Sequence, residues 1–113
     1  MKKAHRELLD ILTEARLLLA RPYNNFDWSS WADTAAALRE VDELISAMES
    51  DRLPSRFSIA TLFAPTGPIQ EVSISSGWGD EFLSLADRCD DATESLYGQR
   101  WWRRLLNWCA STV

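Results

Sequence analysis

Apolar residues recur every three or four positions in four stretches of the chain, the pattern of helices with one buried face. The first stretch, residues 3–20, ends at Arg21-Pro22. We expect its apolar stripe to face the core: Leu8, Ile11, Leu12, Ala15, Leu18 and Leu19. The only histidine, His5, lies outside this stripe and is predicted to be a solvated helix residue.

The second stretch follows a loop at residues 23–26. Ser30 and Asp33 have the spacing of a capping box and predict a helix start here. Its buried stripe would comprise Trp31, Ala35, Leu38, Val41, Ile45 and Met48.

The third stretch, residues 79–97, ends before Gly98, where a left-handed C-cap is expected. Its predicted inward face consists of Phe82, Leu85, Ala86, Cys89, Ala92 and Leu96.

A segment rich in proline and glycine separates the second and third stretches. Residues 62–85 hold three of the four glycines and two of the four prolines. Ser55 is placed to cap a short helical turn over residues 56–64. Pro68, with its φ fixed near a helical value, suits the start of another helix of about two turns. Alternation of Val72 and Ile74 with polar neighbours would suit a strand instead, so a hairpin at residues 57–75 is the alternative.

These patterns predict a mainly α fold, a compact bundle of about four to five helices with an irregular central segment. The alternative is an α+β fold with one short hairpin at residues 57–75. Residues 1–113 are expected to form a single domain, since a chain of 113 residues can bury one core without disulfides or metals.

The central segment also carries a motif, made of residues 62–67 (LFAPTG), 70–71 (QE) and 77–82 (GWGDEF). It resembles a motif in a family of small bacterial domains of unknown function. The likeness covers mainly residues 57–92, with a weaker match at Trp28 and Trp31. The resemblance implies a bacterial accessory protein of the antitoxin or immunity type, and it brings no catalytic residues to this chain.

Charge is unevenly distributed along the chain, which has a net charge of -5. Residues 1–98 hold nine Lys/Arg and all 17 Asp/Glu, a balance of -8, whereas the last fifteen residues carry +3. A nucleic-acid-binding domain would be basic, so this class is not expected. The negative field favours a basic protein as the partner.

Four carboxylates of the third predicted helix lie nearly on one line: Asp80, Asp87, Asp91 and Glu94. As a solvated face they need no further role. Their mutual repulsion would nevertheless be relieved by a cationic partner, so we interpret them as a candidate docking surface. Trp28 and Trp78 are candidate anchors for the same partner, although Trp28 could instead pack over the start of the second helix.

The fourth stretch, residues 99–110, combines a polar stripe containing Arg100, Arg103 and Arg104 with an apolar remainder that includes Trp101, Trp102 and Trp108. One interpretation is that it closes the core, with its arginines toward the acidic third helix. The other is that Trp101, Trp102, Arg103, Arg104 and Trp108 bind a membrane interface or a partner. An acidic domain opposes binding to anionic lipid, which makes the membrane alternative the weaker one.

The sequence predicts no motif for catalysis, metals or cofactors. Cys89 and Cys109 are isolated, and the segment around Gly67 lacks the lysine of a phosphate-binding loop. The first residues lack the apolar core of a signal peptide, and no apolar run reaches the roughly 20 residues of a membrane span. A cytoplasmic chain with reduced thiols is therefore expected.

The sequence favours a non-catalytic protein-binding domain. Its most specific form is an immunity-type inhibitor that docks an acidic helical face on a basic partner, such as a toxin. The alternative is a peripheral membrane or scaffold protein that uses the Trp/Arg-rich residues 99–110.

Overall fold

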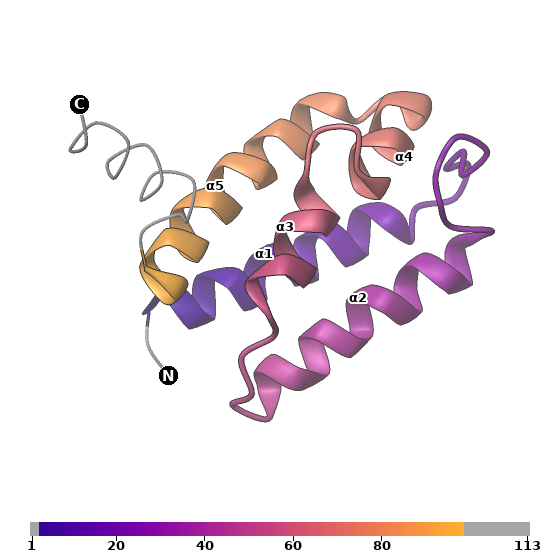
Figure 1. Cartoon of the computed structure of the whole chain (residues 1–113). Helices are drawn as coiled ribbons and strands as arrows, with labels where there is room; N and C mark the ends of the chain where they lie inside the picture. The colour runs from indigo at the N-terminus through magenta and orange to yellow at the C-terminus, as the bar shows by residue number, and fades with distance from the viewer. Residues whose placement is uncertain (1–2, 99–113) are drawn as a thin grey trace, which may run out of the picture.

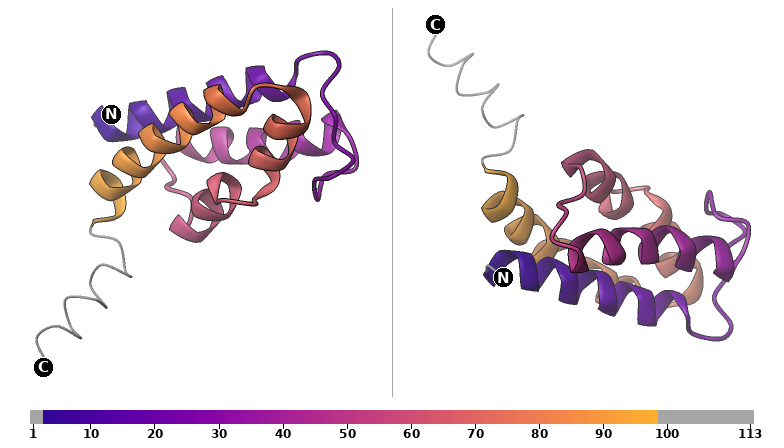
Figure 2. Two further views of the ribbon diagram at one scale, coloured as in Figure 1. Left: turned by 90° about the horizontal axis from the view of Figure 1, so that it is seen from above. Right: turned by 90° about the horizontal axis from the view of Figure 1, so that it is seen from below.

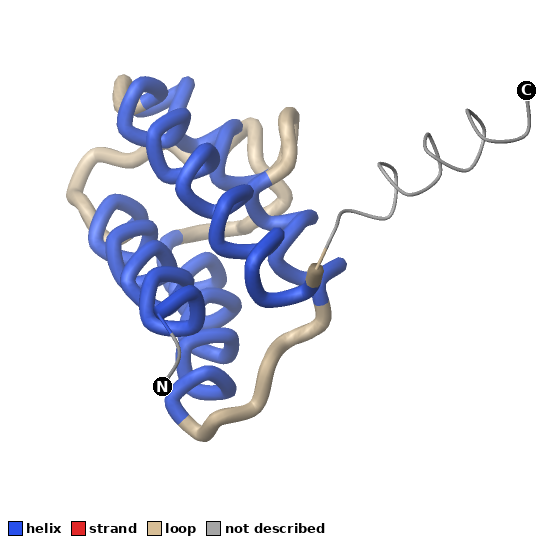
Figure 3. Tube along the Cα trace, turned by 90° about the vertical axis from the view of Figure 1, so that its left-hand side faces the viewer, coloured by secondary structure: helices blue, strands red, loops and turns tan. Residues whose placement is uncertain are grey.

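Residues 3–98, which a computed structural model describes, form five helices. These are α1 (Lys3–Leu19), α2 (Thr34–Glu49), α3 (Arg56–Phe63), α4 (Pro68–Ser76) and α5 (Gly79–Tyr97). No strand occurs in this part of the chain (Figure 3). The predicted mainly α bundle is confirmed, and the alternative hairpin at 57–75 is wrong because α3 and α4 occupy that segment.

The first helix, α1, runs through the middle of the fold, with α2 and α5 packed antiparallel against it (Figure 1). The short helices α3 and α4 pack on each other and on α5, and they cover one face of the three long helices (Figure 2). The six apolar positions predicted for α1 are all buried. This helix needs a wide apolar stripe because it has a long neighbour on each side.

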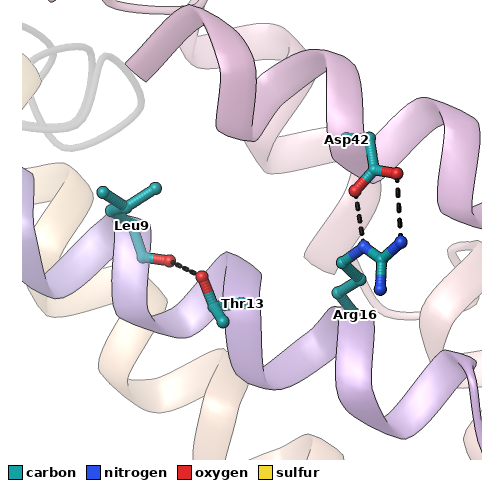
Figure 4. A network of polar contacts seen from close by, with 4 residues as sticks. All are labelled: Leu9, Thr13, Arg16 and Asp42. Atoms are coloured by element: carbon teal, nitrogen blue, oxygen red, sulfur yellow. Dashed lines mark hydrogen bonds and ion pairs between the residues drawn. The ribbon is translucent and has the colours of Figure 1, made fainter. Parts of the chain in front are cut away.

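Two exposed ion pairs connect α1 to its long neighbours. Arg16 donates to both carboxylate oxygens of Asp42 on α2, at 2.6 and 3.3 Å (Figure 4). Arg88 on α5 likewise forms a bidentate pair with Glu14, donating to its two carboxylate oxygens at 2.6 and 3.0 Å. Both pairs favour the antiparallel register without being buried.

The Glu14–Arg88 pair should contribute little to stability because both side chains are nearly half exposed. We expect a coupling energy of about 0.2–1 kcal/mol from the double-mutant cycle of Glu14→Gln and Arg88→Gln. Urea unfolding at 50 mM and at 1 M NaCl measures it, and the coupling should shrink at high salt. A coupling unaffected by salt would contradict a solvent-screened pair.

The start of α2 differs from the prediction. The helix begins at Thr34, and Asp33 is its N-cap, with Oδ1 accepting from the amide of Ala36 at 2.9 Å. The expected capping box from Ser30 is wrong. Upstream, Ser29 Oγ bonds the backbone of Phe26 and Trp31, which keeps this segment in a local turn that competes with helix.

The buried residues of α2 also differ from those predicted. Ala35 is exposed, contrary to the prediction, and Ala37 is buried in its place. Val41 and Met48 are buried as expected, and Leu38 and Ile45 are half-buried.

His5 also departs from its prediction. Its side chain is half-buried, and Nε2 donates to the carbonyl of Met48 at 3.0 Å. The bond gives a carbonyl in the last turn of α2 a second donor, beside the backbone amide of Asp51 at 3.1 Å.

The predicted short helices are confirmed. Ser55 Oγ accepts from the amide of Ser58 at 3.1 Å and caps α3. Pro68 opens α4, and Gly77 ends it in the left-handed region with φ 85°. Gly98 is the C-cap of α5, as expected, and has positive φ, but its ψ of -168° lies outside the left-handed helical region, so the expected left-handed conformation is wrong.

Candidate functional site

The acidic face, defined as Asp80, Asp87, Asp91 and Glu94, lies on α5 opposite the core. Helix α5 packs inward through Phe82, Leu85, Cys89 and Ala92. The predicted inward positions Ala86 and Leu96 are only half-buried.

The carboxylates of this face differ in exposure. Asp80, Asp87 and Asp91 are exposed, and Glu94 is half-buried. Within residues 3–98, the side chains of the first three have no hydrogen bond or ion pair. Their charges therefore face solvent without compensation from the rest of the described chain.

A groove of about 400 Å³ lies between α3 and α5, beside the acidic face. We call it the α3–α5 groove. Its floor is apolar, made by the buried side chains of Ile59, Phe63 and Phe82. Leu83, with 56% of its surface exposed, and the carboxylate of Asp87 border it. An apolar recess next to a carboxylate suits an apolar side chain that has a cation beside it.

The polar groups that line the groove include the carboxylates of Asp87 and Asp90 and one thiol. Cys89 lines it, but burial raises the pKa of this thiol to about 12, with a further contribution from the Asp90 carboxylate. The sulfur is therefore protonated at physiological pH and is a poor nucleophile. The one histidine, His5, is engaged with Met48 and does not line the groove.

Trp28 and Trp78 occupy opposite environments. Trp28 is 74% exposed, so packing over the start of the second helix is wrong and its role as an anchor stays a prediction. Trp78 is only 2% exposed, and its place among the partner-binding residues is wrong. Its ring fills the junction before α5, and Nε1 donates to Asn24 Oδ1 at 2.9 Å.

Asn24 satisfies the buried indole N–H of Trp78 and also binds the end of α1. Its side-chain amide donates to the carbonyls of Leu18 and Leu19 at 2.8 and 3.0 Å, at the end of α1. Asn25 also donates its backbone N–H to Ser76 Oγ at 2.9 Å. The loop after α1, through Asn24 and Asn25, therefore connects the end of α1 to the end of α4 and the start of α5 by hydrogen bonds.

Other exposed residues were missed from the sequence. Phe57 on α3 is 79% exposed, and Tyr23 is 99% exposed with φ 71°. Leu83 at the groove was also not predicted. No local signal identifies them, because a single aromatic residue in a short helix or loop has no periodic context.

The alternative interaction residues Trp101, Trp102, Arg103, Arg104 and Trp108 lie outside the described residues. In the described part of the chain, no helix is both long and apolar enough to cross a bilayer. Among residues 3–98, no three Asp, Glu, His or Cys side chains are grouped so that they could hold a metal ion.

Comparison with protein-family models, with curated proteins and with solved structures gave no match. Function must therefore be argued from the described surface itself. The acidic face and the α3–α5 groove are the features that combine charge, exposure and a concave apolar surface.

Proposed function

We propose that this chain is a non-catalytic protein-binding domain that docks its acidic face on a basic surface of a partner protein. One observation carries the proposal. Asp80, Asp87 and Asp91 are exposed, have no side-chain partner within residues 3–98, and lie next to an apolar groove.

The two parts of this surface act at different stages of binding. Uncompensated carboxylates attract a basic partner at long range and raise the association rate. The α3–α5 groove then takes one aliphatic or aromatic side chain as an anchor, which slows dissociation. Asp87 borders both parts and would bind a lysine or arginine beside that anchor.

An immunity-type inhibitor in the bacterial cytoplasm is the specific form that we propose. The resemblance of residues 62–82 to a motif of small bacterial domains supports it, as does the acidic balance of residues 1–98. The toxin would present a basic surface, which the inhibitor covers.

Capture of the partner from the native host is the first experiment. With the partner in hand, Asp87→Lys with Asp91→Lys should slow association about tenfold or more at low salt, because the steering charge is reversed. Stopped-flow association rates between 20 and 500 mM NaCl measure this, and the difference should shrink as salt rises.

The matched control is Glu43→Lys with Glu49→Lys on α2, which makes the same change in net charge at exposed positions away from α5. Its association should be slowed much less. Equal slowing by both pairs would assign the effect to net charge and refute the acidic face as the docking surface.

A further inference from the structure

We propose that this chain forms a two-fold symmetric homodimer through a second groove, which lies between α1 and α5. This α1–α5 groove has a volume of about 340 Å³, and its two helices run side by side and antiparallel (Figure 2). It shares no lining residue with the α3–α5 groove. The homodimer is therefore independent of the proposed function, and the α3–α5 groove takes no part in the contact.

The centre of the α1–α5 groove is apolar. Leu18 and Leu85 form its floor, and only 8% and 3% of their surfaces are exposed. Leu17 lines the same groove and is 65% exposed. A surface that carries both an apolar recess and an exposed leucine can pack against a copy of itself, because the leucine of each copy enters the recess of the other.

Four exposed charged side chains lie at the two ends of the groove. At one end, Glu14 on α1 is paired with Arg88 on α5. Arg21 comes seven residues after Glu14, and Glu81 comes seven residues before Arg88. Because seven residues span about 10 Å along a helix, Arg21 and Glu81 lie at the other end. Within residues 3–98 neither of these two side chains forms a hydrogen bond or an ion pair.

This arrangement of charges is complementary to itself. Along α1 the groove carries a negative and then a positive charge, and the adjacent part of α5 carries a positive and then a negative one. A two-fold axis that runs along the groove places α1 of one copy over α5 of the other. Each Arg21 then faces Glu81 of the second copy, so the two unpaired charges of each chain become paired.

Net charge favours a second copy as the partner of this surface. Residues 1–98 carry a balance of -8, so two copies repel each other over much of their surface. The charged residues that line the α1–α5 groove sum to zero: Glu14, Glu81, Arg21 and Arg88. Two copies can approach each other here without net repulsion, whereas a basic partner would gain no attraction.

Sedimentation equilibrium of the full chain tests the homodimer. We expect reversible association with a dissociation constant between about 1 μM and 1 mM. Arg21→Glu and Glu81→Arg, made separately, should each raise this constant at least about tenfold, because each places like charges opposite one another. Leu17→Ser should also raise it, because the apolar contact is lost. A wild-type chain that stays monomeric at 1 mM would overturn the proposal.

Mixing the two charge variants tests the contact itself. In a mixed dimer, the new glutamate of the Arg21→Glu chain faces the new arginine of the Glu81→Arg chain, and the unchanged Glu81 and Arg21 face each other. Opposite charges are thus restored at both contacts. The equimolar mixture should associate at least about tenfold more tightly than either variant alone. Native mass spectrometry identifies the mixed dimer by its mass, and a mixture that associates no more tightly than its components would overturn the proposal.

The matched controls are Arg39→Glu and Glu49→Arg, which make the same charge changes at exposed positions on α2. Their dissociation constants should stay within about threefold of the wild-type value, and mixing them should give no gain. Equal weakening by the groove variants and these controls would assign the effect to net charge and overturn the proposal. Far-UV circular dichroism verifies that every variant is folded.

Discussion

Replacement of Trp78 by alanine is expected to destabilise the fold by about 3–5 kcal/mol. The side chain is 2% exposed and lies where α4, α5 and the loop after α1 meet. Its removal would leave a cavity and take the hydrogen-bond donor away from Asn24 Oδ1. Since Asn24 also binds the last carbonyls of α1, the loss should affect the attachment of three segments at once. Urea unfolding followed by circular dichroism at 222 nm measures the change.

Trp28→Ala is the matched control, because it removes the same side chain from a position that is 74% exposed. Its effect on the free energy of unfolding should stay within about 0.5 kcal/mol. Trp78→Phe keeps much of the buried aromatic side chain and removes the N–H donor. Its loss in free energy of unfolding should therefore lie between those of Trp28→Ala and Trp78→Ala. Similar losses for Trp28→Ala and Trp78→Ala would contradict the burial described for these residues.

The long helices were predictable because their apolar residues recur with helical spacing on the side that faces the core. In α1 the six apolar positions repeat without interruption, and every one is buried. The short helix α4 was predictable for a different reason. Its nine residues are too few for periodicity, but Pro68 at the start and Gly77 at the end are specific local signals.

Local sequence signals could not show that Trp28 is exposed and Trp78 is buried. Both precede helices and have acidic neighbours in the sequence. Trp78 packs in the core, where Asn24, 54 residues earlier, accepts from its indole nitrogen, and no local pattern contains that pairing. The start of α2 was missed for a related reason, since the hydroxyl of Ser29 binds its own loop.

The candidate site was only half predictable. Helical spacing placed Asp80, Asp87 and Asp91 on one face, because a single helix determines their relative positions. The groove beside them needs α3 and α5, whose packing depends on the turns between them. Because these turns place α3 beside α5, the exposed side chain of Leu83 borders the α3–α5 groove.

The turn at Gly67 should tolerate no side chain. A Cβ there would lie 2.8 Å from the carbonyl oxygens of both Thr61 and Ala64, which are backbone atoms of α3 and its C-cap. The φ of -77° is open to any residue, so steric overlap and not backbone strain sets the cost. We expect Gly67→Ala to destabilise the fold by about 1–3 kcal/mol as α3 and α4 are forced apart.

Gly79→Ala is the control for this substitution. A Cβ at Gly79, the first residue of α5, meets no atom within 4 Å. Alanine there should be neutral or should stabilise the fold by up to about 1 kcal/mol, since it restricts the unfolded chain. Chemical denaturation of both variants gives the comparison, and hydrogen exchange should show faster opening of α3 and α4 in Gly67→Ala. If the two alanines had the same effect, the close approach of α3 to the start of α4 would be incorrect, and with it the position of the helix that forms one wall of the groove.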